Sequence, residues 1–409
     1  MRAAPSQDEV RRQNLGTLLR YVHVHGATSR AELTSRLGLN RSTIGALTAD
    51  LAGAGLVSEQ AQRDTGRAGR PSLVVRPESD RVYAYAISVE VDRLRAARVG
   101  LGGYILDRRE ADRPRGTPAG DAVAPLAAFI REMHGSVPPG ARYVGGGLAL
   151  AGMVRRADGT VRLAPTVDWI DEPVDAALGA EIGDVLSAAT GATGRLTVAD
   201  VADVSAMVEH SRGAAAGCEN VIYLYGDVGV GAGIIAGGRR VTGHGGYGGE
   251  VGHMVVNPQG RACGCGSRGC WETEIGEYAL LTLAGRCGET GREAVLEVLE
   301  ASTRGDRAAQ RAIRQVGDWI GFGVGNLVNI FNPEAVIFGG TLRDIYLVAA
   351  AQIRSRLNAI ALTACREHVR LRTPELGTDA ALIGAAELAF EHLLADPLDD
   401  VQTAWTGGA

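Results

Sequence analysis

The chain contains no lysine: all 42 of its basic residues are arginine, in a total of 409 residues. The absence has two explanations: the surface selects arginine over lysine, or a GC-rich genome biases the codons toward arginine. The 57 glycines favour the codon bias. The chain also lacks a run of 18 apolar residues, which excludes a membrane-spanning helix. No apolar segment follows the first residues, so we expect no secretory signal.

Charge is unevenly distributed along the chain. Its net value of −5 argues against a nucleic-acid-binding protein as a whole. Residues 1–80, however, hold eleven arginines against eight acidic residues, a net of +3, which leaves −8 for the remainder. A length of 409 residues allows two or three domains. A small basic DNA-binding domain on an acidic body is therefore worth testing.

The first 55 residues show the pattern of a helix-turn-helix. Apolar residues spaced from Leu15 to Val22 predict a helix over about 8–24. Ser29 and Glu32 form a capping box for a short helix that ends at Leu37. Asn40 is placed to cap the next helix, 41–52. The outer face of this last helix is small and polar, and from it we expect DNA contacts by Arg41, Ser42, Thr43 and Thr48.

A β-hairpin is expected after these helices. One strand begins at Gly55 and its partner covers 72–75, which leaves a wing between them. Arg67 and Arg70 lie in this wing, and arginines on a narrow loop suit the minor groove of DNA. A plain packing module of three helices is the alternative for this region, and the arginine-bearing wing favours DNA binding.

From residue 81 onward the signals alternate between strand and helix, which predicts an α/β body. Strands are expected at 82–91, 96–106, 143–151, 196–198, 221–225 and 335–338, and helices at 122–133, 202–213, 276–331 and 380–394. Glycines follow several of the strands, as in folds that bind ligands at loop tips.

Three of the six cysteines fall within eight residues, which does not resemble a secreted disulfide framework and fits a cytoplasmic protein. Cys263, Cys265 and Cys270, together with His253, make a four-ligand set typical of structural zinc. Buried, reduced thiols are the alternative. Glu250 and Glu272 flank this set, and carboxylates held there could accept hydrogen bonds from a sugar or polyol.

Several motifs resemble the ROK family of repressors and sugar kinases, in its regulator branch. They are Gly249 to His253, Cys263 to Gly266, Gly269 to Glu272, Asp227 to Gly233, Asn332 to Glu334 with Gly339 and Gly340, and Gly384 to Ala386. The resemblance implies a winged helix-turn-helix over 1–80 and a two-lobed actin-like, ribonuclease-H-like body. The expected lobes are 81–199 with 375–395, and 200–374 with the zinc loop. The expected tail, 396–409, is flexible. Homodimers or homotetramers are also implied.

Departures from the family's kinases argue against catalysis. The position of their general base, an aspartate, holds Val201, which takes no proton from a sugar hydroxyl. Their first phosphate loop is replaced by a segment with Glu90 and Asp92, whose charges repel phosphate, and Val228 replaces a threonine of the second. A cleft asparagine has become Thr166. The expected effector residues are Gly152, Thr166, Asp203, Glu250, His253 and Glu272.

The sequence thus predicts a ligand-responsive transcriptional regulator. It would repress carbohydrate-related genes by binding double-stranded operator DNA and leave the operator when a small polar, sugar-like effector enters the cleft. Two alternatives stay open: a sugar kinase with a DNA-binding head, and a constitutive regulator whose cleft is vestigial.

Overall fold

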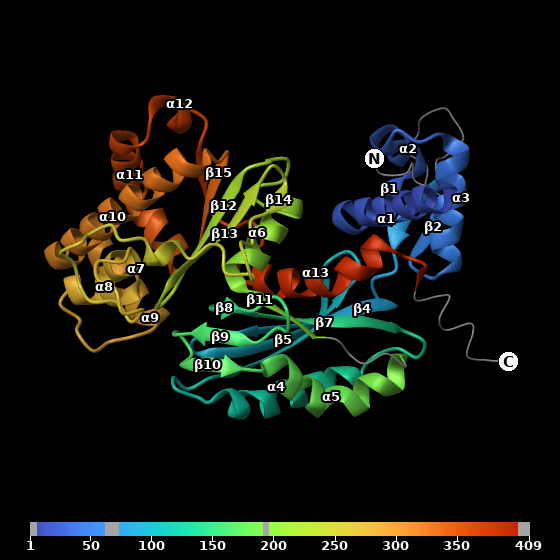
Figure 1. The fold of residues 1–409 in the computed structure, drawn as a ribbon, viewed down its shortest axis with the longest axis horizontal. Helices are drawn as coiled ribbons and strands as arrows, with labels where there is room; N and C mark the ends of the chain where they lie inside the picture. The colour runs from blue at the N-terminus through green and yellow to red at the C-terminus, as the bar shows by residue number, and fades with distance from the viewer. Residues whose placement is uncertain (1–5, 62–72, 191–195, 400–409) are drawn as a thin grey trace.

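The computed structural model describes residues 6–61, 73–190 and 196–399. A small N-terminal head, blue in Figure 1, lies beside the red helix α13 (Ala380–Ala395), and two larger α/β lobes make up the body. None of the helices described is both long and apolar enough to cross a membrane.

The head is a winged helix. Its elements are α1 (Gln7–His25), β1 (Thr28–Ser29), α2 (Arg30–Leu37), α3 (Arg41–Gly53), β2 (Val57–Ala61) and β3 (Leu73–Pro77). Ser6, Ser29 and Asn40 cap the three helices by accepting a hydrogen bond from a backbone N–H. Leu18 and Ile44 are fully buried between the helices. The three predicted helices and the hairpin are present, and the short β1 was not foreseen.

Each lobe is built on a five-stranded sheet. The first has the order β11-β7-β4-β5-β6 and the second β14-β13-β12-β15-β16. Their strands are β4 (Val82–Val89), β5 (Arg93–Gly100), β6 (Tyr104–Asp112), β7 (Arg142–Leu150) and β11 (Leu196–Asp200); then β12 (Val221–Gly226), β13 (Val230–Ala236), β14 (Arg239–Arg240), β15 (Ala335–Gly340) and β16 (Arg370–Arg372). In both sheets an antiparallel meander of three strands is extended by two parallel strands. The two lobes therefore repeat one topology.

Helices cover the sheets. On the first lobe these are α4 (Ala119–His134) and α5 (Val174–Thr190), which lie together below the sheet in Figure 1. The second lobe carries α7 (Glu272–Ile275), α8 (Glu277–Leu283), α9 (Arg292–Thr303), α10 (Arg307–Phe331), α11 (Thr341–Ile360) and α12 (Thr363–Arg366). Small additions are the hairpin strands β8 (Met153–Val154), β9 (Val161–Ala164) and β10 (Trp169–Glu172).

Two helices are exchanged between the lobes. Helix α6 (Val201–Arg212) follows the first sheet but packs on the second, where only a glycine at position 233 leaves room for the Ala202 carbonyl. Conversely, α13 follows the second sheet but packs on the first, with the carbonyl of Ala385 against Gly147. Since α6 and α13 also contact each other, this helix pair joins the two lobes.

Two expectations about the elements were wrong, and two elements were not foreseen. The strand expected at 96–106 is two strands, because Gly102 and Gly103 turn the chain with positive φ. The helical stretch expected at 276–331 is three helices, interrupted near Gly285, Gly291 and Gly305. The glycine-rich segment 230–236 is a strand, and α11 was not foreseen.

The expected flexible tail begins with packed residues. Asp396 pairs with Arg12 of the head at 3.2 Å, and Pro397 is buried. Residues 400–409 lie outside the described part of the chain.

Candidate functional site

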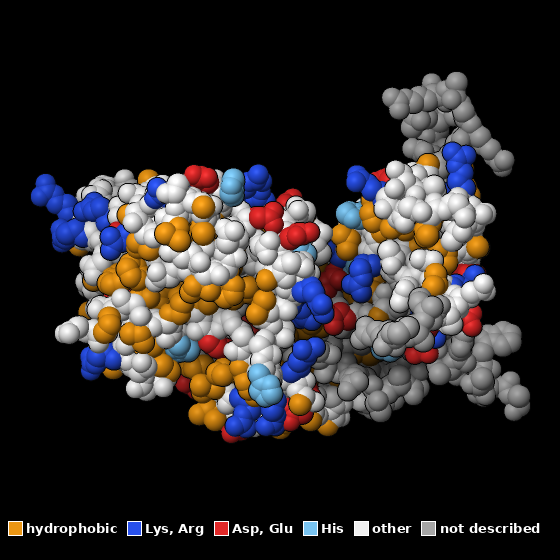
Figure 2. Space-filling view, turned by 45° about the horizontal axis from the view of Figure 1, so that its top comes forward, with side chains coloured by type: hydrophobic (Ala, Val, Ile, Leu, Met, Phe, Trp, Pro, Cys, Tyr) orange, Lys and Arg blue, Asp and Glu red, His pale blue; other side chains and the backbone are white. Residues whose placement is uncertain are grey.

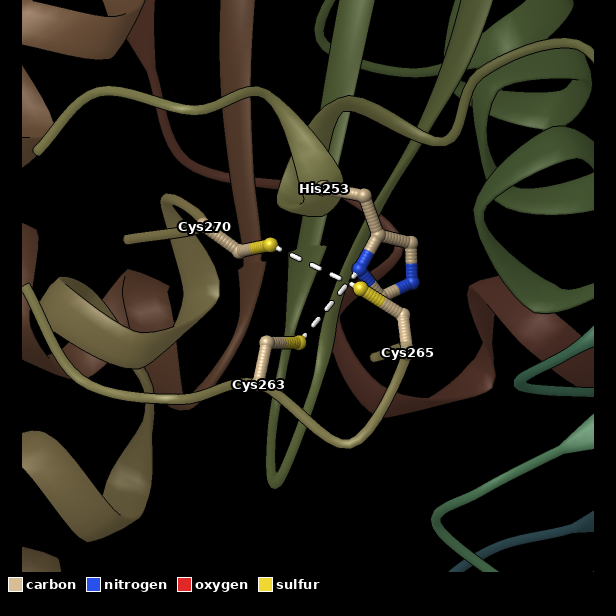
Figure 3. Close-up of side chains that lie close together, drawn as sticks. All are labelled: His253, Cys263, Cys265 and Cys270. Carbon is tan, nitrogen blue, oxygen red and sulfur yellow. Dashed lines mark hydrogen bonds between the residues drawn. The ribbon is translucent and has the colours of Figure 1, made fainter. Parts of the chain in front are cut away.

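His253 and three cysteines converge in the second lobe (Figure 3). Their ligand atoms all lie within 4.8 Å of one another. The Sγ atoms of Cys265 and Cys270 are 3.6 Å apart, and Cys263 Sγ is 3.7 Å from His253 Nδ1. A tetrahedron of Zn–S bonds has edges of about 3.8 Å, so the spacing fits a closed zinc site and is too long for a disulfide.

The pKa values of the three cysteine thiols are shifted by their surroundings. Burial raises the pKa of Cys263, and the neighbouring Glu272 adds to the effect. Burial raises the pKa of Cys270 as well, whereas a hydrogen bond from the Ser267 backbone lowers that of Cys265. Thiolates are the metal-binding form, so a bound zinc ion would stabilise the charges that burial disfavours.

The cysteine loop is rigidly attached to the second lobe. Gly269 has φ 71°, and a Cβ there would lie 1.6 Å from the carbonyl oxygen of Asn257. The next residues anchor the loop: Trp271 is fully buried, and its Nε1 donates to the Trp319 carbonyl of α10 at 2.8 Å. Two of the three cysteines, Cys263 and Cys270, are buried, and Cys265 is exposed.

The effector residues expected from the sequence gather where the lobes face each other. Glu272 Oε1 lies 3.5 Å from His253 Nδ1, and Glu250 lies 4.0 Å from Nε2 of the same ring. A Cβ on Gly229 would contact both Glu272 Oε2 and the Thr166 methyl, at 3.3 and 3.5 Å. Thr166 of the first lobe and Glu272 of the second therefore border one space.

Asp200 contacts Gly152, one of the expected effector residues, and was not singled out from the sequence. It caps α6, with Oδ1 accepting from Ala202 N at 2.7 Å and Oδ2 accepting from Gly152 N at 3.0 Å. The Gly152 amide is therefore engaged within the protein. An aspartate directly before a helix, at the end of a strand, was the signal available in the sequence.

Burial is the main cause of the raised pKa values of Asp200, Asp203 and Glu250. Burial and the nearby charges of Asp200 and Glu250 raise the pKa of Asp203 to about 7. Burial, with Asp200 and Glu272, raises the pKa of Glu250 to about 7. Burial also raises the pKa of Asp200 to about 6, although backbone N–H donors oppose the shift. Burial is the first cause of all three shifts, and like charges add to those of Asp203 and Glu250.

A second acidic group lies at the turns that begin the two meanders. Glu90 and Asp92 follow β4, and Asp227 follows β12 at the equivalent place in the other lobe. Burial raises the pKa of Asp227 to about 7, and the charges of Glu277, Asp92 and Glu90 add to it. Carboxylates concentrated here repel the phosphates that a kinase must hold.

Comparison with known proteins identifies the family of this chain. Residues 84–392 match the ROK family. The chain belongs to the ROK family. Its mixed α/β fold, with a winged-helix head and a two-lobed actin-like body, is confirmed.

Relatives of two kinds are found. The xylose repressor of Bacillus subtilis (strain 168) is 26% identical over 392 residues, 95% of this chain and 97% of that protein. The glucokinase of Streptomyces coelicolor is 30% identical over 318 residues, but covers 73% of this chain and 95% of its own. A crystal structure of a ROK family transcriptional regulator, a homologue of the E. coli MLC protein, matches 98% of this chain and all of its own with 25% identity and a TM-score of 0.76.

In this ROK protein the predicted DNA-contacting residues have different fates. Arg41 and Ser42 are exposed at the start of α3, and Thr43 is half-buried. Ser42 Oγ donates to Asn40 Oδ1 at 2.7 Å. Thr48 was wrongly placed on the outer face: it is fully buried and donates to the Gly45 carbonyl at 3.1 Å. Arg67 and Arg70 lie outside the described residues.

A buried polar junction that the sequence did not reveal joins the head to the body. His23 of α1 is fully buried, with Nε2 2.9 Å from Glu387 of α13. Its Nδ1 accepts from Gly102 N at 2.8 Å, which assigns the proton to Nε2. Arg212, at the end of α6, donates to Glu387 and to the Gly102 carbonyl. Burial alone would raise the pKa of Glu387, but the hydrogen bond from His23 and the charge of Arg212 lower it overall.

Proposed function

We propose that this ROK protein is a ligand-responsive transcriptional regulator that represses carbohydrate-related genes. Its head binds double-stranded operator DNA, and a small polar, sugar-like effector in the cleft releases it. The observation that carries the proposal is the course of α6, because one short helix connects the cleft to the head.

Helix α6 begins in the cleft and ends at the head junction. Asp200 caps its first turn, Asp203 lies in that turn, and Arg212 is its last residue. Twelve residues of α-helix span about 18 Å. A displacement at the cleft end is therefore transmitted to Arg212, since a helix of this length is stiff on that scale. Arg212 in turn holds α1 through Glu387.

Helix α6 also binds the segment in which the chain returns to the first lobe. Glu209 is fully buried and accepts hydrogen bonds from the backbone of Ala214, Glu375 and Leu376 at 2.7, 3.1 and 2.9 Å. The last two residues lie between β16 and α13. Rotation of α6 therefore also moves α13, the helix that contacts the head.

Closure of the two lobes on the effector is coupled to operator binding through the distance between the two heads of a dimer. In a homodimer, two copies of α3 enter successive major grooves about one helical turn apart, and Arg41 and Ser42 contact the DNA. Thr43 completes this surface, and Arg67 and Arg70 of the wing anchor the minor groove. Lobe closure changes the distance between the heads. An effector needs to favour one state by only a few kcal/mol to empty the operator.

Structural zinc, held by His253, Cys263, Cys265 and Cys270, keeps the effector loop in place. The metal supplies a fixed point for His253, so that Nε2 is left to face Glu250 and the effector. Gly152, Thr166, Asp203, Glu250 and Glu272 form the remaining surroundings of the ligand.

Phosphoryl transfer is not part of the proposal. Val201 occupies the position of the kinase base and is 3% exposed, within the apolar core. The acidic turns at Glu90, Asp92 and Asp227 disfavour ATP, as described above. The 318 residues shared with the glucokinase also leave out about a quarter of this chain, whereas the xylose repressor match covers 95% of it.

A direct test combines DNA binding with ligand release. Purified full-length protein is mixed with DNA from upstream of its own gene, and fluorescence anisotropy is recorded with and without a set of sugars. We expect tight binding that one sugar class weakens at least tenfold. Failure to bind DNA would overturn the regulator, and binding that no sugar changes would favour a constitutive regulator.

A matched variant tests the coupling path. Arg212→Ala is expected to keep DNA binding and lose release by the sugar. Arg304→Ala, an exposed arginine of the second lobe, is the control and is expected to behave as the unmodified protein.

A further inference from the structure

An ion pair links the two lobes away from the helix pair α6 and α13. Arg115, between β6 and α4 of the first lobe, donates from Nη2 to both carboxylate oxygens of Glu277, at 3.1 and 3.4 Å. Glu277 is the first residue of α8, which lies at the left of the second lobe in Figure 1, whereas α6 and α13 lie near the centre of the molecule. The lobes are therefore held together at more than one place.

Glu277 is a fixed point of the second lobe. Its side chain is 4% exposed. Its Oε1 accepts a hydrogen bond from Gly291 N, at the start of α9, at 2.7 Å, and its own backbone N–H donates to the Asp227 carbonyl at 3.2 Å. One residue thus connects α8, α9 and the turn that follows β12.

Arg115 belongs to a segment that is attached to the first lobe in a similar way. Arg113, two residues earlier, is 2% exposed, and its guanidinium donates to the carbonyls of Val91 and Val167, at 2.9 Å each. The backbone N–H of Arg113 donates to the Asp92 carbonyl at 2.7 Å. The segment that carries Arg115 is therefore anchored on the turn that follows β4.

The ion pair thus joins the turns after β4 and β12, which are equivalent in the two lobes. Both turns are acidic, with Glu90 and Asp92 on one and Asp227 on the other. Burial is the first cause of the raised pKa of Asp227, Glu90 and Asp92 of the other lobe add to it, and the charge of Arg115 opposes it. Like charges on the two turns push the lobes apart, so a cation that crosses from one lobe to the other favours their contact.

The head shares an apolar core with the first lobe. Leu18 and Ile44 of the head belong to the same buried cluster as Ala84 and Val99 of the first sheet. On the face shown in Figure 2, by contrast, a notch separates the head from the second lobe. The contact between the lobes therefore also determines where the second lobe lies relative to the head.

We propose that Arg115 and Glu277 form a latch that keeps the two lobes in contact at the turns after β4 and β12. The proposal goes beyond the proposed function, because the latch acts in the protein without DNA or effector. When the pair is broken, the nearly buried carboxylate of Glu277 loses its cation, and contact with water then stabilises it. The turns separate while α6 and α13 still join the lobes, so that the second lobe rotates relative to the first lobe and the head.

Hydrogen exchange of the full-length protein, measured by mass spectrometry at pH 7 and low salt, tests the latch from both lobes. Glu277→Gln removes the negative charge but keeps an acceptor for Gly291 N, and Arg115→Gln removes the cation. We expect each variant to raise the exchange rate roughly threefold or more in the turn of the opposite lobe, because that turn loses its contact. This turn is 89–93 for Glu277→Gln and 226–230 for Arg115→Gln. A role confined to one lobe would change only the lobe that carries the substitution.

The double variant and a matched control complete the test. In the double variant, the rise in each turn is expected to equal that of a single variant, because either change already removes the whole pair. Arg131→Gln breaks an ion pair within the first lobe, with Glu181 at 3.3 Å and a similarly exposed arginine, and is expected to leave both turns unchanged. Unchanged exchange in the opposite lobe in both single variants would overturn the latch, and so would effects that add in the double variant.

Salt provides a second measurement should circular dichroism show that Glu277→Gln does not fold. The side chain of Arg115 is 39% exposed, so ions from solution screen the pair. High salt should raise the exchange of both turns in the unmodified protein and should have no such effect in Arg115→Gln. An equal effect of salt in the two proteins would contradict the latch. These measurements contain neither DNA nor sugar, so their outcome does not depend on whether the protein regulates transcription.

Discussion

The two lobes repeat one strand topology, but they carry different additional features. The meander of the first lobe begins at a turn with Glu90 and Asp92, and that of the second begins at a turn with Asp227. Beyond these turns the lobes differ. The first carries the head, through the Gly102 turn between β5 and β6, and the second carries the cysteine loop. Equivalent strands thus provide a scaffold, while the insertions and turns determine the function.

This comparison also separates two kinds of stabilisation. The first lobe is attached to the head by a buried ion network of His23, Arg212 and Glu387. The second lobe instead contains His253, Cys263, Cys265 and Cys270, a cluster that could hold a metal ion. A bound metal would stabilise the fold there, and a chelator would remove that contribution.

Loss of the metal ligand is expected to have the largest effect, and it should affect only the second lobe. Cys270→Ala removes a fully buried ligand. We expect zinc content to fall from about one ion per chain to nearly none, and the melting temperature to drop by several degrees, since metal binding contributes directly to folding. Hydrogen exchange should rise within 251–275 and stay unchanged in the first sheet. Cys287→Ala, an exposed cysteine outside the cluster, is the control; unchanged zinc in Cys270→Ala would contradict the assignment.

The next largest effect is expected from disrupting the junction of His23, Arg212 and Glu387, which attaches the head to the first lobe. Glu387→Gln leaves Arg212 without its charged partner in a buried place, which destabilises by roughly 3 kcal/mol. Chemical denaturation followed in both variants measures this, with Glu391→Gln, on the exposed side of the same helix, as the control. Equal stabilities of the two variants would show that the network does not hold the head.

The turns after β4 and β12 can be compared through the pH dependence of the protein's stability. The pKa of Asp227 is raised to about 7, so the folded state binds its proton more tightly than the unfolded state does. Stability is therefore lost as the pH rises from about 4 through 7. Asp227→Asn removes this loss and should stabilise the protein by on the order of 1–2 kcal/mol more at pH 8 than at pH 5. Asp92→Asn, on the exposed turn of the other lobe, serves for comparison, and an equal pH dependence in both would contradict the difference between the turns.

The smallest effect concerns the head alone. Arg41→Ala should weaken operator binding by about 1 kcal/mol and reduce the slope of log K against log salt by about one, because one phosphate contact is lost. Anisotropy titrations between 50 and 200 mM salt would measure it, and Arg36→Ala, an exposed arginine of α2, allows a comparison within the head. An unaltered slope would remove Arg41 from the DNA surface.

Much of the fold was predictable from local patterns in the sequence. The caps at Ser29 and Asn40 and the spacing of Leu15, Leu18 and Val22 predicted the helices of the head, because capping and periodicity are local properties. The cysteine spacing likewise predicted the ligand set. Thr48 shows the limit of such reasoning: a polar residue was assigned to the outer face, but its hydroxyl is satisfied by the helix itself and its methyl packs inside.

Sequence alone therefore predicted the winged helix and the four residues that come together in a cluster able to hold a metal ion. Only the tertiary structure decided the repeated sheets, the exchange of α6 and α13, and the junction of His23 with Glu387. The physical reason is the separation along the sequence of the residues that interact. Helix caps and ligand spacing depend on residues a few positions apart, whereas Glu387, the partner of His23, lies 364 residues away in the sequence, and only folding brings the two together.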